Sequence, residues 1–301
     1  MACSCKYSLS NTGAPNCTPI QGVIKKLIIV PLKASDGSDN YIDLSATLDE
    51  AYFSDLINEA DKSKRWYPTP EMKNVTSEKA ESIFEEFEDG SRDFIKDGVR
   101  SFLGLMPKQS PQLLAQLQNW RCAKFGVFIV DNNRAIIGAE REEGKLFPIV
   151  VENASWNPVL MFGTDTSIQK IQLGFNFDVD EQDGDLRMIE YAEISPVNPL
   201  SFEGLLDVNN VVSNISTTGF DVKYTTIYGS ALEKEPVEGL LLADFSLFNV
   251  TDNLSVAITS VTEILAGKYT LVFPAQTSGD SLRLSVSKDG YDFKVASALV
   301  P

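Results

Sequence analysis

The spacing of apolar positions near the start of the chain predicts strands before any helix. Residues 23–32 form a β-branched, apolar run that is typical of a buried strand. The turn-forming residues 35–40 and the strand-like residues 41–44 predict a hairpin with that run. A short helical patch is expected within residues 48–75, together with a loop that carries two prolines.

The clearest helical period begins at Thr76. Apolar residues recur there every three or four positions, and Glu and Asp crowd the opposite face. Gly90 interrupts the pattern and is expected to bend or divide the helix. Ser110 and Pro111 then supply the cap and the first-turn proline of a second helix. The apolar stripe of the first helix consists of Ala80, Ile83, Phe84, Phe87, Phe94, Ile95, Val99, Phe102 and Leu103.

From Lys124 onward the apolar residues follow a period of two or form short runs. The strands expected here cover residues 124–131, 135–138, 146–151, 159–162, 168–177 and 186–194. With the helices before them they predict an α+β unit, mostly antiparallel β-sheet with packed helices, over residues 23–195. Residues 1–22 are rich in Ser, Asn, Thr, Pro and Gly, which predicts an extended N-terminal arm.

The segment 195–199 breaks both periods and predicts a domain boundary. Residues 200–301 then carry short strands separated by turns, the pattern of an all-β sandwich. Tyr269 stands where immunoglobulin-like domains carry a tyrosine corner, and Leu271 stands where an antibody domain has cysteine. We therefore expect an immunoglobulin-like sandwich without a disulfide. Its expected strands are residues 222–228, 243–250, 254–258, 269–273 and 282–286.

The charge balance limits the partners of the chain. Among 301 residues, 42 are acidic and 26 are basic, a formal net charge of −16. Because DNA affinity comes largely from Lys and Arg that neutralise phosphates, tight DNA binding is not expected. The acidity either keeps the protein soluble by self-repulsion or lines a passage through which DNA slides. No apolar stretch approaches the roughly 20 residues that cross a bilayer, and residues 1–10 lack the apolar run of a secretory signal.

Histidine is absent, which excludes Ser-His-Asp and Cys-His catalysis and every histidine-containing metal site. A hydrolase that depends on paired carboxylates stays open as an alternative. Cys3, Cys5 and Cys17 do not have the spacing of a zinc site. Together with Cys122 they are expected to be reduced thiols, and a disulfide to Cys17 requires oxidising conditions.

Two local clusters offer further chemistry. Residues 178–185 hold five acidic side chains and a glycine, which suits calcium, but the spacing departs from an EF-hand loop and favours a solvated hairpin turn. Residues 62–67 interleave basic and aromatic side chains, which suits nucleic-acid stacking or, as we favour, a protein interface. No catalytic, cofactor-binding or metal-ligating residue is assigned, and the chain is not expected to be an enzyme.

Three segments resemble virion proteins of crAss-like and related Bacteroidales bacteriophages. They are MACSCKYSLSNTGAPNC at residues 1–17, VEGLLLADFSLFNVT at residues 237–251 and KDGYDF at residues 288–293. The resemblance implies a role in assembly and therefore transfers no functional residues. It also implies that the α+β unit is similar to tail-tube folds, in which a curved antiparallel sheet faces the channel and a helix packs behind it.

The resemblance further implies a structural subunit of the phage tail, made in the host cytoplasm and present in the virion. We expect a ring of the tail barrel or tube, a cyclic homo-oligomer that contacts other tail and portal-proximal proteins. DNA would pass through it without tight binding, along a wall with acidic inward positions. The alternative is a receptor- or carbohydrate-binding phage adhesin, in which Tyr224, Tyr228 and Tyr291 of the C-terminal sandwich form the binding platform.

Overall fold

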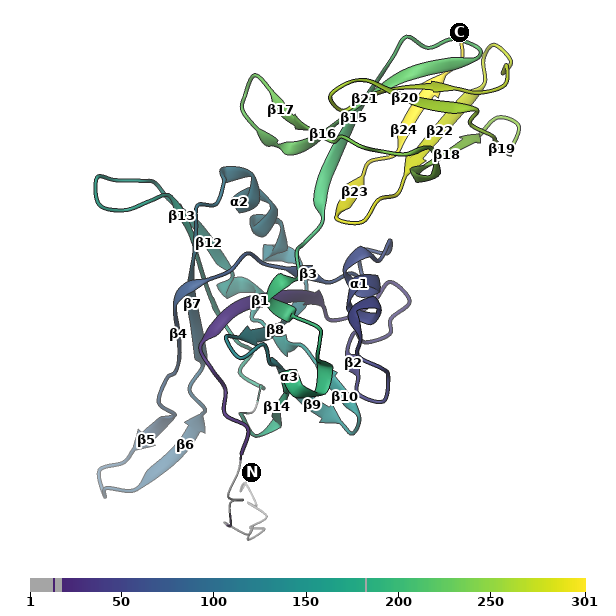
Figure 1. Cartoon of the computed structure of the whole chain (residues 1–301). Coiled ribbons are helices and arrows are strands. Elements are labelled where there is room, and N and C mark those ends of the chain that lie inside the picture. The colour runs from purple at the N-terminus through teal and green to yellow at the C-terminus, as the bar shows by residue number, and fades with distance from the viewer. Residues whose placement is uncertain (1–12, 14–17, 182) are drawn as a thin grey trace.

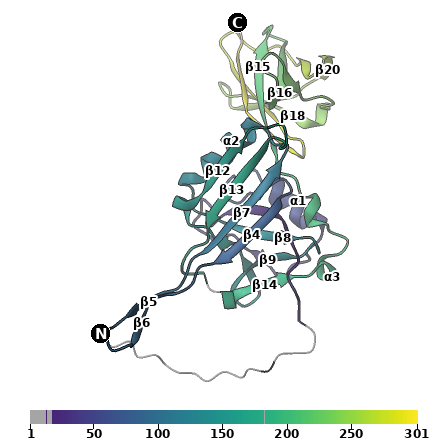
Figure 2. The ribbon, with the colours of Figure 1, turned by 90° about the vertical axis from the view of Figure 1, so that its left-hand side faces the viewer.

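The computed structural model describes residues 13, 18–181 and 183–301, and antiparallel strands dominate it (Figure 1). This confirms the coarse expectation of a β-rich α+β protein. The strands from β1 to β14 form the sheets of an N-terminal unit, and the strands from β15 to β24 form those of a C-terminal unit. Figure 2 shows the two units end to end, with the C-terminal unit above the other.

The larger sheet of the N-terminal unit has eight strands. Its order is β2 (Ile42–Asp43), β10 (Lys145–Phe147), β9 (Ile136–Glu142), β8 (Phe125–Asp131), β1 (Ile24–Pro31) and β3 (Tyr67–Pro68), with β11 (Ile149–Val150) on β8 and β14 (Leu186–Ile189) on β9. The predicted strand 23–32 is confirmed as β1. The turn predicted at residues 35–40 is present, with an antiparallel bridge between Lys33 and Asp39. The predicted pairing of residues 41–44 with β1 is wrong, because β2 pairs with β10 instead. Strand pairs that lie far apart in sequence cannot be read from local turn signals.

The smaller sheet has four strands and a long extension. Its order is β12 (Asn157–Met161), β13 (Lys170–Asn176), β7 (Arg100–Pro107) and β4 (Lys73–Lys79). Beyond one end of β4 and β7 the chain continues as a two-stranded hairpin that projects from the body (Figure 2). That hairpin consists of β5 (Ile83–Glu86) and β6 (Arg92–Lys96).

The predicted helix that begins at Thr76 is wrong, since the segment forms the four strands β4 to β7. Gly90 adopts a φ of 81°, in the left-handed region, and turns the chain between β5 and β6. Farther along, Phe102 is buried and Leu103 is exposed, the alternation of a strand. The three- to four-residue spacing arises because apolar side chains occupy both faces of the projecting hairpin, where burial imposes no period of two.

The helices are short. They are α1 (Glu50–Asn58), α2 (Pro111–Gln118) and α3 (Tyr191–Ile194), with 3-10 turns η1 (Asn119–Cys122), η2 (Asn153–Ser155), η3 (Asp183–Asp185), η4 (Pro199–Ser201) and η5 (Leu242–Asp244). The predicted second helix is confirmed as α2, because the Ser110 side chain accepts a hydrogen bond from the Leu113 amide and Pro111 opens the first turn. The helical patch expected in residues 48–75 is α1, capped by Asp49.

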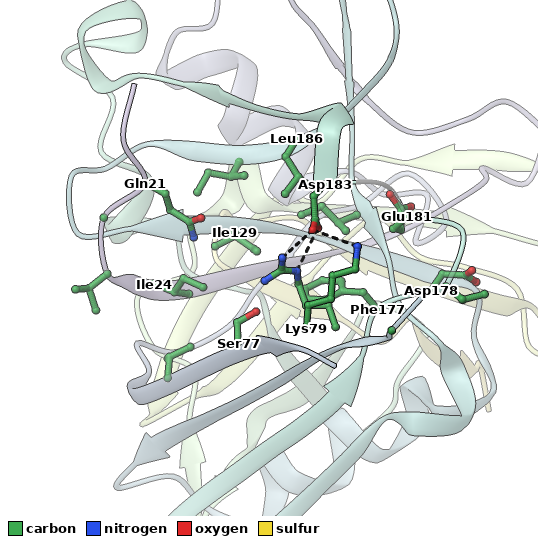
Figure 3. Close-up of a pocket in the computed structure, with 18 residues that line it drawn as sticks. Gln21, Ile24, Ser77, Lys79, Ile129, Phe177, Asp178, Glu181, Asp183 and Leu186 are labelled. Carbon is green, nitrogen blue, oxygen red and sulfur yellow. Dashed lines mark hydrogen bonds and ion pairs between the residues drawn. The ribbon is translucent and has the colours of Figure 1, made fainter. Parts of the chain in front are cut away.

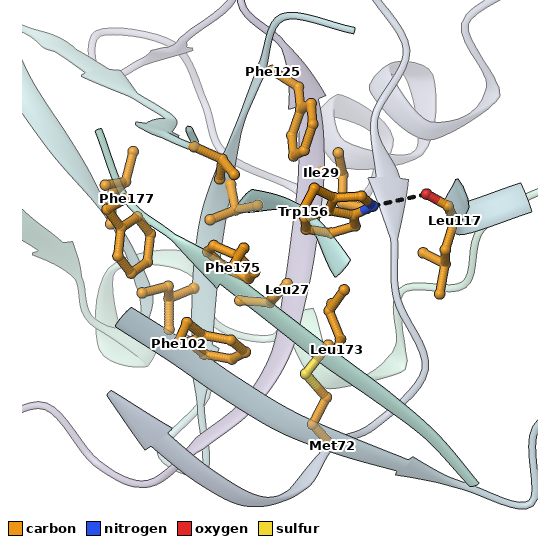
Figure 4. Packing of buried hydrophobic residues seen from close by; sticks show 14 of the residues in the cluster. Leu27, Ile29, Met72, Phe102, Leu117, Phe125, Trp156, Leu173, Phe175 and Phe177 are labelled. Atoms are coloured by element: carbon orange, nitrogen blue, oxygen red, sulfur yellow. Dashed lines mark hydrogen bonds between the residues drawn. The ribbon is translucent and has the colours of Figure 1, made fainter. Parts of the chain in front are cut away.

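The N-terminal unit has an apolar core on each face of its eight-stranded sheet. Leu27 and Ile29 of β1 point into the core shared with the four-stranded sheet, whereas Ile28 and Val30 point into the core under α1. A pocket opens at one end of the first core (Figure 3). Figure 4 shows the centre of that core, where the indole of Trp156 donates a hydrogen bond to the carbonyl of Leu117 (2.7 Å).

The C-terminal unit consists of two sheets that share one apolar core. One sheet runs β20 (Ser260–Leu265), β21 (Lys268–Val272), β16 (Gly219–Gly229), β15 (Leu206–Ser213) and β23 (Tyr291–Phe293), with β17 (Lys234–Pro236) on β16. The other runs β19 (Leu254–Val256), β18 (Phe245–Asn249), β22 (Ser281–Val286) and β24 (Ala296–Leu299). The five strands predicted from the sequence are present as β16, β18, β19, β21 and β22.

Tyr269 does not form the predicted tyrosine corner. Its hydroxyl donates to the carbonyl of Val237 (2.9 Å) and accepts from the amide of Leu240 (3.2 Å). A tyrosine corner bonds the backbone only a few residues upstream, whereas these partners lie 32 and 29 residues away. The side chain instead links the buried ring to the connection between β17 and β18 through these two hydrogen bonds. Burial raises the pKa of Tyr269 to about 12, so the hydroxyl stays protonated at neutral pH.

Two leucine substitutions test this description of burial. Leu173 is 0% exposed between the sheets and Leu232 is 101% exposed. We expect Leu173→Ala to lower the free energy of unfolding by about 2–5 kcal/mol, because a cavity replaces the side chain. The matched control Leu232→Ala should change it by less than about 0.5 kcal/mol. Urea titration followed by tryptophan fluorescence measures both, and equal effects would contradict the assigned core.

Candidate functional site

The acidic segment 178–185 joins β13 to β14, which belong to different sheets, so the predicted hairpin turn is wrong. Two of its carboxylates form ion pairs, each with different basic side chains. Asp183 accepts from Lys79 (3.3 Å) and Arg100 (3.1 Å), and Glu181 pairs with Arg141. Within the described residues, which omit residue 182 of this segment, no group of three or more acidic or cysteine side chains is placed to hold a metal ion. The segment therefore fastens two sheets together.

The pocket beside this segment has a volume of about 400 Å³. Figure 3 shows Asp183 with dashed contacts to its basic partners near the centre of the pocket, and Ile129 and Phe177 are among the apolar residues that line it. Burial alone would raise the pKa of Asp183, but hydrogen bonds from Arg100 and Lys79 and their positive charges lower it below its ordinary value. A general acid needs a raised pKa. Asp183 is thus ionised at neutral pH and acts as an ion-pair partner.

The basic and aromatic patch 62–67 lies at the contact between the two units. Trp66 is 1% exposed in the core under α1, so its ring is not available to stack on a base. Arg65 and Lys62 both approach one carboxylate oxygen of Asp292 in β23, at 2.9 Å and 2.7 Å. The patch favoured as a protein interface is therefore engaged within the chain.

Other hydrogen bonds support the same contact. The Gln116 amide donates to Asp207 (2.8 Å), and the Gly290 amide donates to the Asn58 side chain (3.2 Å). Burial alone would raise the pKa of Asp292, but hydrogen bonds from the two neighbouring cations and their charges lower it. The carboxylate is therefore charged at neutral pH and links the units electrostatically.

The three tyrosines proposed as a carbohydrate platform do not share a surface. Tyr224 is 0% exposed in the C-terminal core, and burial raises its pKa. Tyr228 and Tyr291 are half-buried. Since a stacking platform needs exposed ring faces, the predicted platform is wrong.

The cysteines divide into two groups. Cys3, Cys5 and Cys17 lie outside the described residues. Cys122 is a free, exposed thiol at the end of η1.

Figure 2 shows the outward face of the four-stranded sheet with no helix or strand of the N-terminal unit in front of it. Residues opposite one another in the pairing register share a face, so Thr76, Leu103 and Gly174 form one outward row. The outward side chains are mostly uncharged, and the charged ones are Glu78 at one end and the lysines 73 and 170 toward the other. The acidic wall expected from the net charge is not a property of this face.

Neither edge strand of this sheet pairs with a second strand among the described residues, although α2 packs against β12. Among the described residues, β4 pairs only with β7 and β12 pairs only with β13. An unpaired edge presents a row of backbone donors and acceptors that can bind another strand. No local pattern in the sequence predicts these edges, because an edge is defined by the pairing order and not by the composition of a strand.

Comparisons with known proteins add no relative. No family model matches the chain, and no curated protein or solved structure does so either. In the part of the chain that the structure describes, no helix has the length and apolar character needed to cross a bilayer. A functional assignment therefore depends on the geometry of the surfaces above.

The link between the units yields a prediction at Asp292. We expect Asp292→Asn to lower the free energy of unfolding at pH 7 by about 2 kcal/mol, because Arg65, only 5% exposed, loses its carboxylate partner. The pKa of Asp292 is lowered in the fold, so its contribution is complete above the ordinary carboxyl pKa and is lost as the pH falls through the lowered value. Urea titrations at several pH values measure the difference.

The control is Asp289→Asn in the same turn, where the side chain is exposed and makes no ion pair among the described residues. It should unfold like the unaltered protein at every pH. The loss of unfolding free energy in Asp292→Asn should disappear at a pH where the Asp292 carboxyl of the unaltered protein is protonated. A loss that persists unchanged at that pH would contradict the assigned ion pair.

Proposed function

We propose that the chain is a structural subunit of a bacteriophage virion that forms an oligomeric ring of the tail barrel or tube, through which DNA passes. The observation that carries this proposal is the four-stranded sheet, whose two edge strands each lack a second strand partner among the described residues. The resemblance of residues 1–17, 237–251 and 288–293 to virion proteins of crAss-like phages supplies the biological setting. The sequence contains no histidine, which is consistent with a protein that acts through assembly and not through histidine-dependent catalysis.

The strand directions favour lateral assembly. Successive strands of the sheet are antiparallel in the order β12, β13, β7 and β4, so the two edge strands run in opposite directions. When β4 of one copy lies beside β12 of the next, the antiparallel pattern continues without interruption. The two surfaces in contact are different, so the interface is heterologous and closes into a ring when its rotation divides a full turn.

The strand count sets a lower limit on the ring. A closed barrel of about 16–18 strands leaves an aqueous channel, and each copy contributes four strands. A passage wide enough for a DNA duplex therefore needs more than about four copies. At 33.1 kDa per copy, such a ring exceeds about 130 kDa.

The outward face suits such a passage. Its rows are mostly uncharged, so it offers few cations to phosphates, and the net charge of −16 repels the duplex as a whole. The four-stranded sheet would then face the channel as in a tail-tube fold, with the eight-stranded sheet behind it where a tail-tube fold has a helix. The C-terminal unit, which we interpret as an immunoglobulin-like sandwich, would decorate the outside or contact another tail protein.

The adhesin alternative has less support. Tyr224 is buried, so the aromatic surface that a carbohydrate would stack on is not formed by the residues assigned to it. Binding of capsular polysaccharide by the isolated chain, with no oligomer and no copies in purified virions, would favour the adhesin over the ring.

Cross-linking tests the lateral contact directly. In a variant whose four cysteines are replaced by serine, Thr76→Cys on β4 and Val159→Cys on β12 place one thiol on each edge strand, both on the outward face. We expect a short bifunctional maleimide to produce a ladder of covalent multimers, because each copy carries both halves of the contact. Denaturing electrophoresis and native mass spectrometry read the ladder.

The controls separate this contact from random collision. Each single-cysteine variant should stay monomeric on the denaturing gel, and so should Val159→Cys combined with Leu232→Cys, whose second thiol lies in the C-terminal unit. A dimer from the Thr76→Cys variant alone would indicate a symmetric contact and contradict the ring. A protein that is monomeric at every concentration and missing from purified virions would overturn the proposed function.

A further inference from the structure

The β5–β6 hairpin exposes more apolar surface than a hairpin in water can support alone. Its five large apolar side chains, Ile83, Phe84, Phe87, Phe94 and Ile95, are 43–57% exposed. The only aromatic pair among them is Phe84 with Phe94, with ring centroids 5.8 Å apart. An isolated two-stranded hairpin is marginally stable, and clustered exposed apolar residues indicate a surface that another molecule covers.

The charge of the hairpin narrows the choice of that molecule. Residues 80–97 contain seven acidic and two basic side chains, a net charge of −5. One of the basic residues, Arg92, is already paired with Glu86. Such a segment is repelled by nucleic acid and by anionic lipid. It therefore fits a protein surface that is apolar and basic.

A surface of that kind lies at the opposite end of the same sheet. The hairpin leaves the sheet at the row of Lys79 and Arg100, whereas Met161, Lys170 and Pro107 form the last row at the other end. Figure 1 shows the two ends apart, with β5 and β6 at the lower left and the loop between β12 and β13 at the upper left of the N-terminal unit. We call this second surface the far end and define it as residues 159–170 with Lys73 and Lys108.

The far end complements the hairpin in its exposed apolar side chains and in the sign of its charge. Met161, Phe162 and Ile168 are exposed, Phe162 by 75%. Its three lysines, at 73, 108 and 170, make no ion pair among the described residues, and Asp165 is its one acidic side chain. Apolar centres with charges of opposite sign at the rim are the arrangement of specific protein interfaces.

We infer that the β5–β6 hairpin of one copy docks on the far end of a second copy. The contact joins two different surfaces along the strand direction, so it repeats head to tail and builds a stack. Lateral pairing of β4 with β12 runs across the strands and builds the ring. That the stacked objects are rings rests on the proposed function, whereas the pairwise docking does not.

Charge reversal on each side tests the docking. A hairpin variant carries Glu85→Lys, Glu88→Lys and Asp93→Lys, and a far-end variant carries Lys108→Glu and Lys170→Glu. None of these side chains makes an ion pair among the described residues, so the fold should persist. Each variant alone presents like charges at the contact and should associate end to end at least about tenfold more weakly than the unaltered chain.

An equimolar mixture of the two variants is the decisive control. The basic hairpin then meets an acidic far end, and the remaining acidic hairpin meets a basic far end, so association should return to near the unaltered level. Sedimentation velocity and negative-stain microscopy measure it, and raising the salt concentration should weaken it in every case. Circular dichroism checks that each variant is folded.

The outcomes separate the two proposals. Single rings in each variant and stacks in the mixture support both. Stacks of unchanged length in either variant alone would overturn the docking while leaving the ring intact. End-to-end association that is rescued by mixing, with no ring at any concentration, would keep the docking and overturn the proposed function. Weak association in each variant with no rescue on mixing would overturn the docking.

Discussion

Burial of β1 on both faces is the constraint on which the N-terminal unit depends. Its side chains alternate between two cores, Leu27 and Ile29 on one side and Ile28 and Val30 on the other. The strand pairs with β8 along nearly its whole length, so its backbone forms hydrogen bonds within the molecule while its apolar side chains are buried. One strand therefore fixes the four-stranded sheet on one face and the α1 region on the other.

This arrangement leaves the four-stranded sheet only half covered. Its inner face contributes Phe102, Leu173 and Phe175 to the shared core. Among the described residues, its edge strands β4 and β12 have no second strand partner, and these are the strands that would pair between copies under the proposed function. The acidic segment 178–185 and the ion pairs at Asp183 hold the two sheets together at the end from which the hairpin projects.

The sequence predicted much of the fold and little of its pairing. Residues 23–32 and α2 were identified correctly, because β-branched runs and a Ser-Pro cap act locally. The segment after Thr76 has a helical spacing of apolar residues but forms strands, since a hairpin exposed on both faces shows no period of two. Strands β15, β17, β20, β23 and β24 of the C-terminal unit lie outside the ranges predicted from the sequence. The partner of β2 could not be predicted, because pairing depends on the whole sheet.

The positions of the candidate surfaces could not be predicted from the sequence. Net charge and the missing histidine pointed away from catalysis, and the resemblance pointed to assembly. The aromatic and basic patch at residues 62–67 was assigned to an interface, and it lies at the contact with Asp292 of the same chain. The edges of the four-stranded sheet and the far end became visible only from the strand order, because they combine residues that are distant in sequence.

The most direct test of this account is a cryo-electron microscopy map of the assembled protein at a resolution that traces strands. We expect a closed ring in which β4 of each copy pairs antiparallel with β12 of the next, with the outward face of the four-stranded sheet toward the channel. A map in which both edges stay unpaired, or in which copies meet through their C-terminal units alone, would contradict it.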